Sequence, residues 1–134
     1  MQALFANNIH NLEMVQRRAA RFVTGINHRT TSVTNLLHQL QWPTLQERRA
    51  TNNVIMMYRI VNHLVAIPTS CLIPTAATLR GHNQRFLVPI ARTQLYQHSF
   101  FPDAITLWHS LPSTTVACNS IDTFKYELQK TKLY

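Results

Sequence analysis

The residues of this chain that could support catalysis are few and scattered. Five carboxylates are spread along 134 residues, and no two have the spacing of a paired-metal or acid/base site. The seven histidines contain no HxxxH or HExxH pattern, and the Cys–His intervals do not fit a zinc finger. Two glycines, Gly25 and Gly81, are too few for a phosphate-binding loop. A Cys–His nucleophile pair stays open, because such residues meet only in the fold. We therefore expect no catalytic residue, no metal, no cofactor and no small-molecule substrate.

Positive charge is the second chemical property of the chain. Thirteen Lys and Arg stand against five Asp and Glu, which gives a net charge of +8, and ten of the thirteen are Arg. Arginine suits phosphate binding and base stacking, so the surplus points first to nucleic acid and next to an anionic membrane surface. A solvated basic surface, or charges that pair with the rest of a larger assembly, are the alternatives.

The two cysteines and the hydropathy pattern bear on location. Cys71 and Cys118 form no disulfide framework and suit a reducing compartment, each as a small buried hydrophobic residue. No apolar run is long enough to span a membrane, and the first residues do not resemble a signal peptide. We expect a nuclear or cytoplasmic protein that is not secreted and does not bind membranes.

The positive charge is carried by predicted helices, the first of which runs from Gln2 to Thr24 and ends at Gly25. Its apolar residues share one side, which we expect to face the core: Leu12, Val15, Ala19, Phe22 and Val23. Arg17, Arg18 and Arg21 lie on the other side. A second helix is predicted over residues 33–40, capped by Thr31 or Ser32.

The longest helical pattern follows a capping box, in which Thr44 precedes Glu47 by three residues. It runs from residue 45 to about residue 65. Its apolar face consists of Ala50, Val54, Met57, Tyr58, Val61 and Val65. Arg48, Asn52, Arg59 and His63 line the opposite side, which Met56 and Ile60 make partly apolar. This second arginine stripe predicts a composite basic surface with the first helix.

The second half of the chain has weaker periodicity. Residues 67–98 read as a connection that could contain a short β-hairpin near 85–97, limited to a sheet edge by Pro89. Helices are predicted over residues 102–110, with Ile105 and Trp108 buried, and over residues 121–132 after Ser120, with Phe124 and Leu128 facing inward. Residues 113–119 are predicted to be a loop.

The expected fold is therefore mainly α, a single domain of about five helices over residues 1–134. It divides into a helical half (about 1–66), a connection (67–98) and C-terminal helices (99–134). The candidate nucleic-acid-binding residues are the arginines of the two long helices and the polar turn at 80–85: Arg17, Arg18, Arg21, Arg48, Arg49, Arg59, Arg80, His82 and Arg85. Phe100, Phe101 and Trp108 could stack on bases, although we expect them in the core.

Several ordered blocks of sequence resemble a known family. The blocks QRRAARFVTG, WPTLQERR, RGH and SFFPDAITLWHSLP occur in the order found in the C-terminal segment of reverse transcriptases from metazoan non-LTR (LINE-like, jockey-type) retrotransposons. The resemblance covers about residues 8–129. The chain departs from the family at His109, where the family often has Asn, at Cys71, and in its first eleven residues.

The resemblance implies a fragment of an RNA-directed DNA polymerase without its catalytic part. The polymerase motif with two adjacent aspartates is absent, as are the endonuclease motifs, so no catalytic residue can be transferred. The first helix would lie at or just after the thumb, where such enzymes hold the template–primer duplex. Non-specific contact with RNA or an RNA–DNA hybrid, beside the upstream polymerase domains, is the expected role. The alternative is a structural tail packed on the polymerase body, or an orphan fragment of a degraded element without activity of its own.

Overall fold

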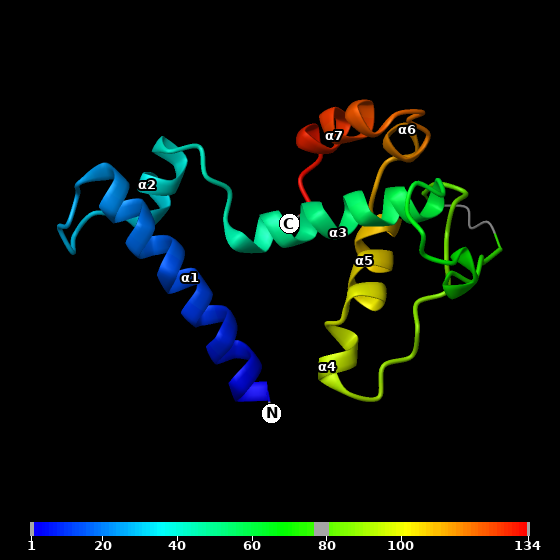
Figure 1. The fold of residues 1–134 in the computed structure, drawn as a ribbon, viewed down its shortest axis with the longest axis horizontal. Helices are drawn as coiled ribbons and strands as arrows, with labels where there is room; N and C mark the ends of the chain where they lie inside the picture. The colour runs from blue at the N-terminus through cyan, green and yellow to red at the C-terminus, as the bar shows by residue number, and fades with distance from the viewer. Residues whose placement is uncertain (1, 77–80, 134) are drawn as a thin grey trace. The chain divides into compact units, whose positions relative to one another are not determined.

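The computed structural model describes the backbone of residues 2–76 and 81–133 and the side chains of residues 6–76 and 81–133 (Figure 1). The fold is mainly α, as predicted, and the described residues contain no β-strand. The longer helices are α1 (Gln2–Thr24), α2 (Val33–Gln39), α3 (Leu45–Val61), α5 (Phe100–His109) and α7 (Ile121–Lys130). Shorter turns of helix are η1 (Thr69–Cys71), α4 (Gln94–Gln97) and α6 (Ser113–Val116).

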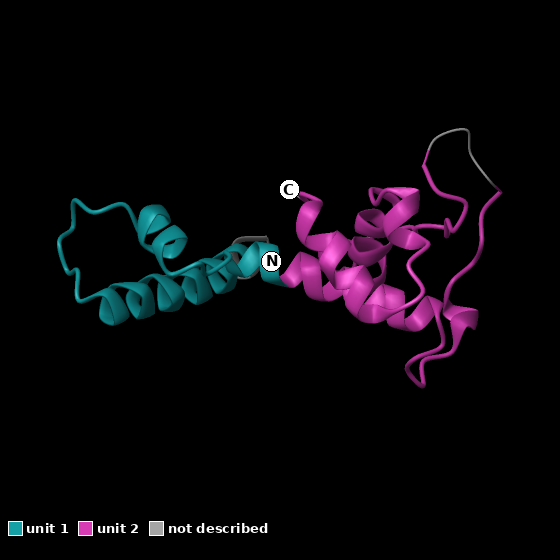
Figure 2. Ribbon diagram, turned by 90° about the horizontal axis from the view of Figure 1, so that it is seen from above, with its two compact units in different colours: residues 1–48 teal, residues 49–134 magenta. Residues whose placement is uncertain are grey.

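The chain forms two compact units, residues 1–48 and residues 49–134 (Figure 2). The first unit contains α1, α2 and the segment that leads into α3, and α1 packs on α2. The second unit contains most of α3 and all later elements. The boundary therefore falls inside α3, whereas the composition of the sequence suggests a division near residue 66.

The helices begin and end through local signals. The predicted capping box at the start of α3 is confirmed: Thr44 N donates to Glu47 Oε2 at 2.8 Å, and Glu47 N donates to Thr44 Oγ1 at 3.2 Å. Gly25 ends α1 with φ 68°. Helix α3 ends at Val61 and not near residue 65, because His63 takes the left-handed conformation (φ 57°) and Leu64 N donates to Arg59 O at 2.8 Å. This is the Schellman arrangement, here without glycine.

The hydrophobic core lies in the second unit. Tyr58 stacks on Phe124 with ring centroids 4.3 Å apart, and Trp108 lies 6.1 Å from the same phenyl ring. The Tyr58 hydroxyl donates to Cys118 O at 2.8 Å, and Asn53 Nδ2 donates to Asp103 Oδ2 at 2.9 Å, which ties α3 to α5. The predicted inward positions on α5 and α7 are buried, whereas on the apolar face of α3 Val61 and Val65 are only half-buried and pack against the core. Buried Ile60 shows that the opposite side of α3 is partly covered, as expected. The buried residues that confirm the prediction are Ala50, Val54, Met57, Tyr58, Ile105, Trp108, Phe124 and Leu128.

The first unit has a much smaller core, and here the prediction for α1 is wrong. Leu12, Val15, Phe22 and Val23 are 55%, 62%, 86% and 58% exposed, while among the described side chains of α1 (residues 6–24) Gln16 and Ala20 are buried. The side of α1 that packs inside the unit is thus rotated away from the apolar stripe. The stripe is left uncovered within this unit.

The connection between α3 and α5 contains no β-hairpin within residues 85–97. Residue Phe86 instead forms a single antiparallel bridge with Pro74, supported by Thr75 N donating to Arg85 O at 3.0 Å and Leu87 N donating to Ile73 O at 2.7 Å. The residues expected to pair with it form α4, because the Thr93 side chain accepts from Tyr96 N and caps that helix.

The C-terminal helices and the two cysteines differ in part from the prediction. Residues 113–116 form the short helix α6 after Pro112, where a loop was expected. Ser120 caps α7 as predicted, its hydroxyl accepting from Thr123 N at 3.2 Å, and α7 ends at Lys130. Cys71 is exposed and Cys118 is half-buried, so neither is the buried thiol that the sequence suggests.

Candidate nucleic-acid interface

The basic side of α1 is the most accessible cationic feature of the first unit. Arg17 and Arg18 are exposed, and Arg21 is half-buried. None of the three pairs with a carboxylate among the described residues. Because the helix advances by about 1.5 Å per residue, the three guanidinium groups originate within about 6 Å along the axis. They place three guanidinium groups, whose planar shape suits phosphate contacts, on one short stretch of helix.

The carboxylates of the chain do little to neutralise this charge. Glu47 is held in the capping box, and Asp103 accepts from Asn53. Glu127 forms an ion pair with Lys130 at 2.9 Å. With five acidic against thirteen basic residues, the carboxylate side chains leave a net positive charge of eight.

The arginines of α3 divide between the two units. Arg48 is exposed at the end of the first unit. Arg49, exposed, and Arg59, half-buried, belong to the second. The composite surface expected from the two helices therefore stays a prediction, and the candidate arginines that belong to the first unit are Arg17, Arg18, Arg21 and Arg48.

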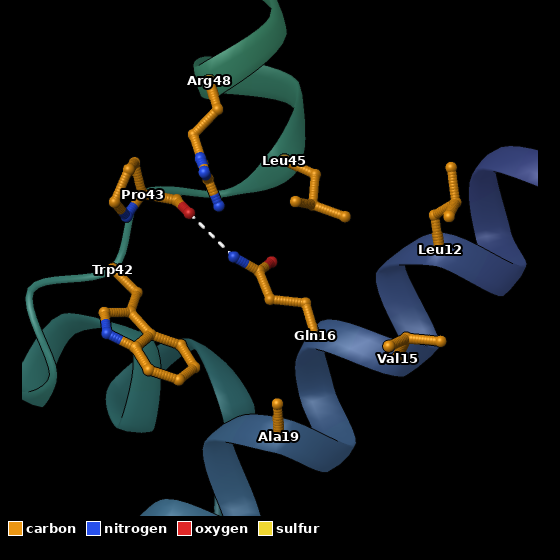
Figure 3. Close-up of a pocket in the computed structure, with 8 residues that line it drawn as sticks. All are labelled: Leu12, Val15, Gln16, Ala19, Trp42, Pro43, Leu45 and Arg48. Atoms are coloured by element: carbon orange, nitrogen blue, oxygen red, sulfur yellow. Dashed lines mark hydrogen bonds between the residues drawn. The ribbon is translucent and has the colours of Figure 1, made fainter.

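An apolar groove of about 540 Å³ lies beside this charge in the first unit (Figure 3). One wall is α1, and the other consists of the segment that connects α2 to α3 together with the first turn of α3. The lining residues are Leu12, Val15, Gln16, Ala19, Trp42, Pro43, Leu45 and Arg48. Gln16 Nε2 donates to Pro43 O at 2.9 Å and thereby fixes the segment against the helix, while Gln16 Oε1 is buried without a donor among the described residues.

Sequence reasoning did not identify this groove. Its one available signal is Gln16, which lies 40° from Leu12 on the helical wheel, between the apolar stripe and the buried Ala20. From this position the Gln16 side chain reaches the backbone of Pro43.

The polar turn ahead of residue 86 has a structural role, which corrects the expectation for His82. Its ring is 4% exposed, and Nε2 donates to Trp108 O at 2.8 Å. The same ring meets Trp108 edge-on with centroids 5.8 Å apart. Trp108 Nε1 in turn donates to Gln84 O at 2.9 Å. His82 therefore holds the turn on α5 and presents no surface to nucleic acid, and Trp108, fully buried, stacks on no base.

His109 continues this network. Its Nε2 accepts a hydrogen bond from Phe86 N at 3.1 Å, and burial followed by the charge of Arg85 lowers the pKa of its ring. Gly81 passes close to the same place, where a Cβ would come within 2.7 Å of Arg85 Nη1. Arg85 is half-buried here, and Arg80 lies outside the described residues.

The remaining aromatic candidates belong to the core. Phe100 and Phe101 are half-buried, meet edge-on at 5.2 Å and pack against the buried cluster of the second unit. Within residues 2–76 and 81–133, no three His, Cys, Asp or Glu side chains gather as ligands for a metal ion. No described helix is both long enough and apolar enough to cross a membrane.

Comparison with known proteins identifies no relative. The chain matches no protein-family model, no curated protein and no solved structure.

Proposed function

We propose that this chain is a non-catalytic nucleic-acid-binding module, the C-terminal segment of a retrotransposon reverse transcriptase, that contacts RNA or an RNA–DNA hybrid through the basic side of α1. The observation that carries the proposal is the cluster of Arg17, Arg18 and Arg21, which has no carboxylate partner among the described residues. The family origin rests on the ordered sequence blocks described above.

The mechanism is electrostatic. Guanidinium groups that neutralise phosphates release condensed counterions, so the affinity falls steeply with salt and depends little on base sequence. For single-stranded nucleic acid, each phosphate contact contributes about 0.7 to the slope of log K against log salt. Three contacts from α1 thus account for a slope of about −2.

The test is a fluorescence-anisotropy titration of the full chain with labelled single-stranded RNA and with an RNA–DNA hybrid, at several salt concentrations. The variant replaces Arg17, Arg18 and Arg21 with Gln. The matched control replaces Arg29, Arg92 and Lys132 with Gln, which removes the same charge from exposed positions elsewhere. We expect the α1 variant to reduce the magnitude of the salt slope by about 2 and the control to change it much less.

Two results would overturn the proposal. One is the absence of binding at low salt, or a flat salt response, in the natural chain. The other is equal loss of binding in the α1 variant and in the control, which would mean that only net charge matters. If the chain binds no nucleic acid while circular dichroism shows it folded, the structural-tail alternative is favoured.

A further inference from the structure

The first unit exposes more apolar surface than its own elements can cover. Among residues 6–48, only Ala20 and Leu36 are buried hydrophobic residues, whereas four large apolar side chains of α1 are more than half exposed. Large exposed apolar patches on a small folded unit mark interaction sites.

The shape of the patch favours an inserted side chain. Leu12, Val15 and Ala19 form one wall of the groove, and Trp42 and Leu45 stand on the other (Figure 3). Its volume of about 540 Å³ is large enough for one or two aliphatic or aromatic side chains. A concave groove along a helix is the geometry that receives the apolar face of another helix, with anchors at i, i+3, i+4 and i+7.

The charge beside the groove selects the chemistry of that helix. The exposed Arg48 lines the groove, and no carboxylate among the described residues pairs with it. Arg18 lies 40° from Phe22 on the helical wheel of α1, at the border of the apolar stripe. An occupant with acidic residues beside its apolar anchors would pair with both.

The same charges disfavour a second copy of this chain. A two-fold interface brings the same patch of each copy together, so the positive charges of Arg48 and Arg18 from both copies would share one interface. Each copy carries a net charge of +8. A flat lipid surface, in turn, would leave the concave space between α1 and Trp42 unfilled.

We propose that the groove between α1 and residues 42–48 binds an acidic amphipathic helix of a partner protein, which places large apolar side chains between Val15 and Trp42 and carboxylates beside Arg48. The groove lies on the side of α1 opposite Arg17 and Arg21, which carry the proposed function. Arg18 lies at the border between the two surfaces and belongs to both.

The probe is a synthetic peptide of about 15 residues, long enough to form a helix on binding, with Leu at i, i+3, i+4 and i+7 and Glu elsewhere. Two matched peptides replace Glu with Lys or scramble the Leu positions. The readout is the fluorescence of Trp42, because the other tryptophan, Trp108, is 0% exposed in the second unit. We expect the Glu peptide to bind with a blue shift and the two matched peptides to bind at least about tenfold more weakly.

Variants of the full chain locate the site. Ala19→Phe fills the groove, and Arg48→Glu reverses the charge beside it, so each should weaken binding of the Glu peptide by about tenfold. Arg92→Glu is the matched control, since Arg92 is exposed in the second unit. Ala19→Phe should leave RNA affinity unchanged, so that the two proposals can fail independently.

The proposal is overturned if the Lys or scrambled peptide binds as tightly as the Glu peptide, or if Ala19→Phe leaves peptide binding unchanged. It is also overturned if anionic phosphatidylglycerol vesicles shift the Trp42 fluorescence more than the peptide does. The last contrary result is the formation of concentration-dependent dimers in sedimentation. The third outcome would assign the face to a lipid surface and the fourth to a second copy.

Discussion

Replacing His82 with Ala tests whether the turn before residue 86 is a structural element. The substitution removes the hydrogen bond from Nε2 to Trp108 O and the edge-on contact with the Trp108 ring. It also leaves a cavity at a position that is 4% exposed. We expect the second unit to lose stability and the nucleic-acid affinity of the folded chain to stay the same.

The magnitude follows from the contacts. The hydrogen bond contributes about 0.5–1.5 kcal/mol, and the aromatic pair contributes about the same. Trp108 O still accepts from Leu111 N at 3.2 Å, so the carbonyl is not left without a partner. Together with the cavity, the expected loss is about 2–4 kcal/mol, which at about 4–8 °C per kcal/mol lowers the melting temperature of a unit of this size by about 8–32 °C.

The assay is urea and thermal unfolding followed by circular dichroism and tryptophan fluorescence, with anisotropy titration against RNA for the folded variant. His28→Ala is the control, because His28 is exposed in the loop after α1. A loss below about 0.5 kcal/mol would refute the structural role. A stable variant with reduced RNA affinity would restore His82 as a surface contact.

Two more predictions concern single residues of the second unit. Because the pKa of His109 is lowered in the folded chain, the unfolded chain binds more protons as the pH falls. The contribution of His109 to the free energy of unfolding is therefore complete above about pH 6.5 and decreases below it. The variant His109→Gln keeps an acceptor for Phe86 N without titrating and should flatten this acid dependence, measured as urea midpoints between about pH 5 and 8. His63→Gly should raise the urea midpoint, because a left-handed residue with a side chain costs about 1–2 kcal/mol and the flexibility of glycine offsets only part of this.

Each has a clear contrary result. Unfolding midpoints of His109→Gln that decline in acid as steeply as those of the natural chain would show that other groups set the dependence. An unchanged or lower midpoint for His63→Gly would show that the His63 side chain makes a stabilising contact. Arg29→Gln, at an exposed loop position, serves as the common control.

Local features of the fold could be predicted from the sequence because their causes are local. The start of α3 depends on Thr44 and Glu47, three residues apart, and both hydrogen bonds of the box form. The bounds of α1 follow from its period and from Gly25. Trp108 and Phe124 are inward on short amphipathic helices and are buried.

Features that depend on distant contacts could not be predicted. Periodicity shows that Leu12, Val15 and Phe22 share one side of α1, but not whether another element covers that side. His82 sits in a polar stretch of sequence, and its burial results from Trp108, which is 26 residues away. The exposed positions of Arg17 and Arg18 agree with the candidate site, while their ligand stays a prediction.

The capping box at Thr44 also bears on how the chain could be divided. The capping box of α3 uses no residue before Thr44, and the members of the large hydrophobic cluster lie between Ala50 and Leu133. We therefore expect a polypeptide of residues 44–134 to fold by itself, and circular dichroism should show a cooperative unfolding transition for it. Residues 1–43 lack a core of comparable size, so a polypeptide of these residues alone should show no such transition.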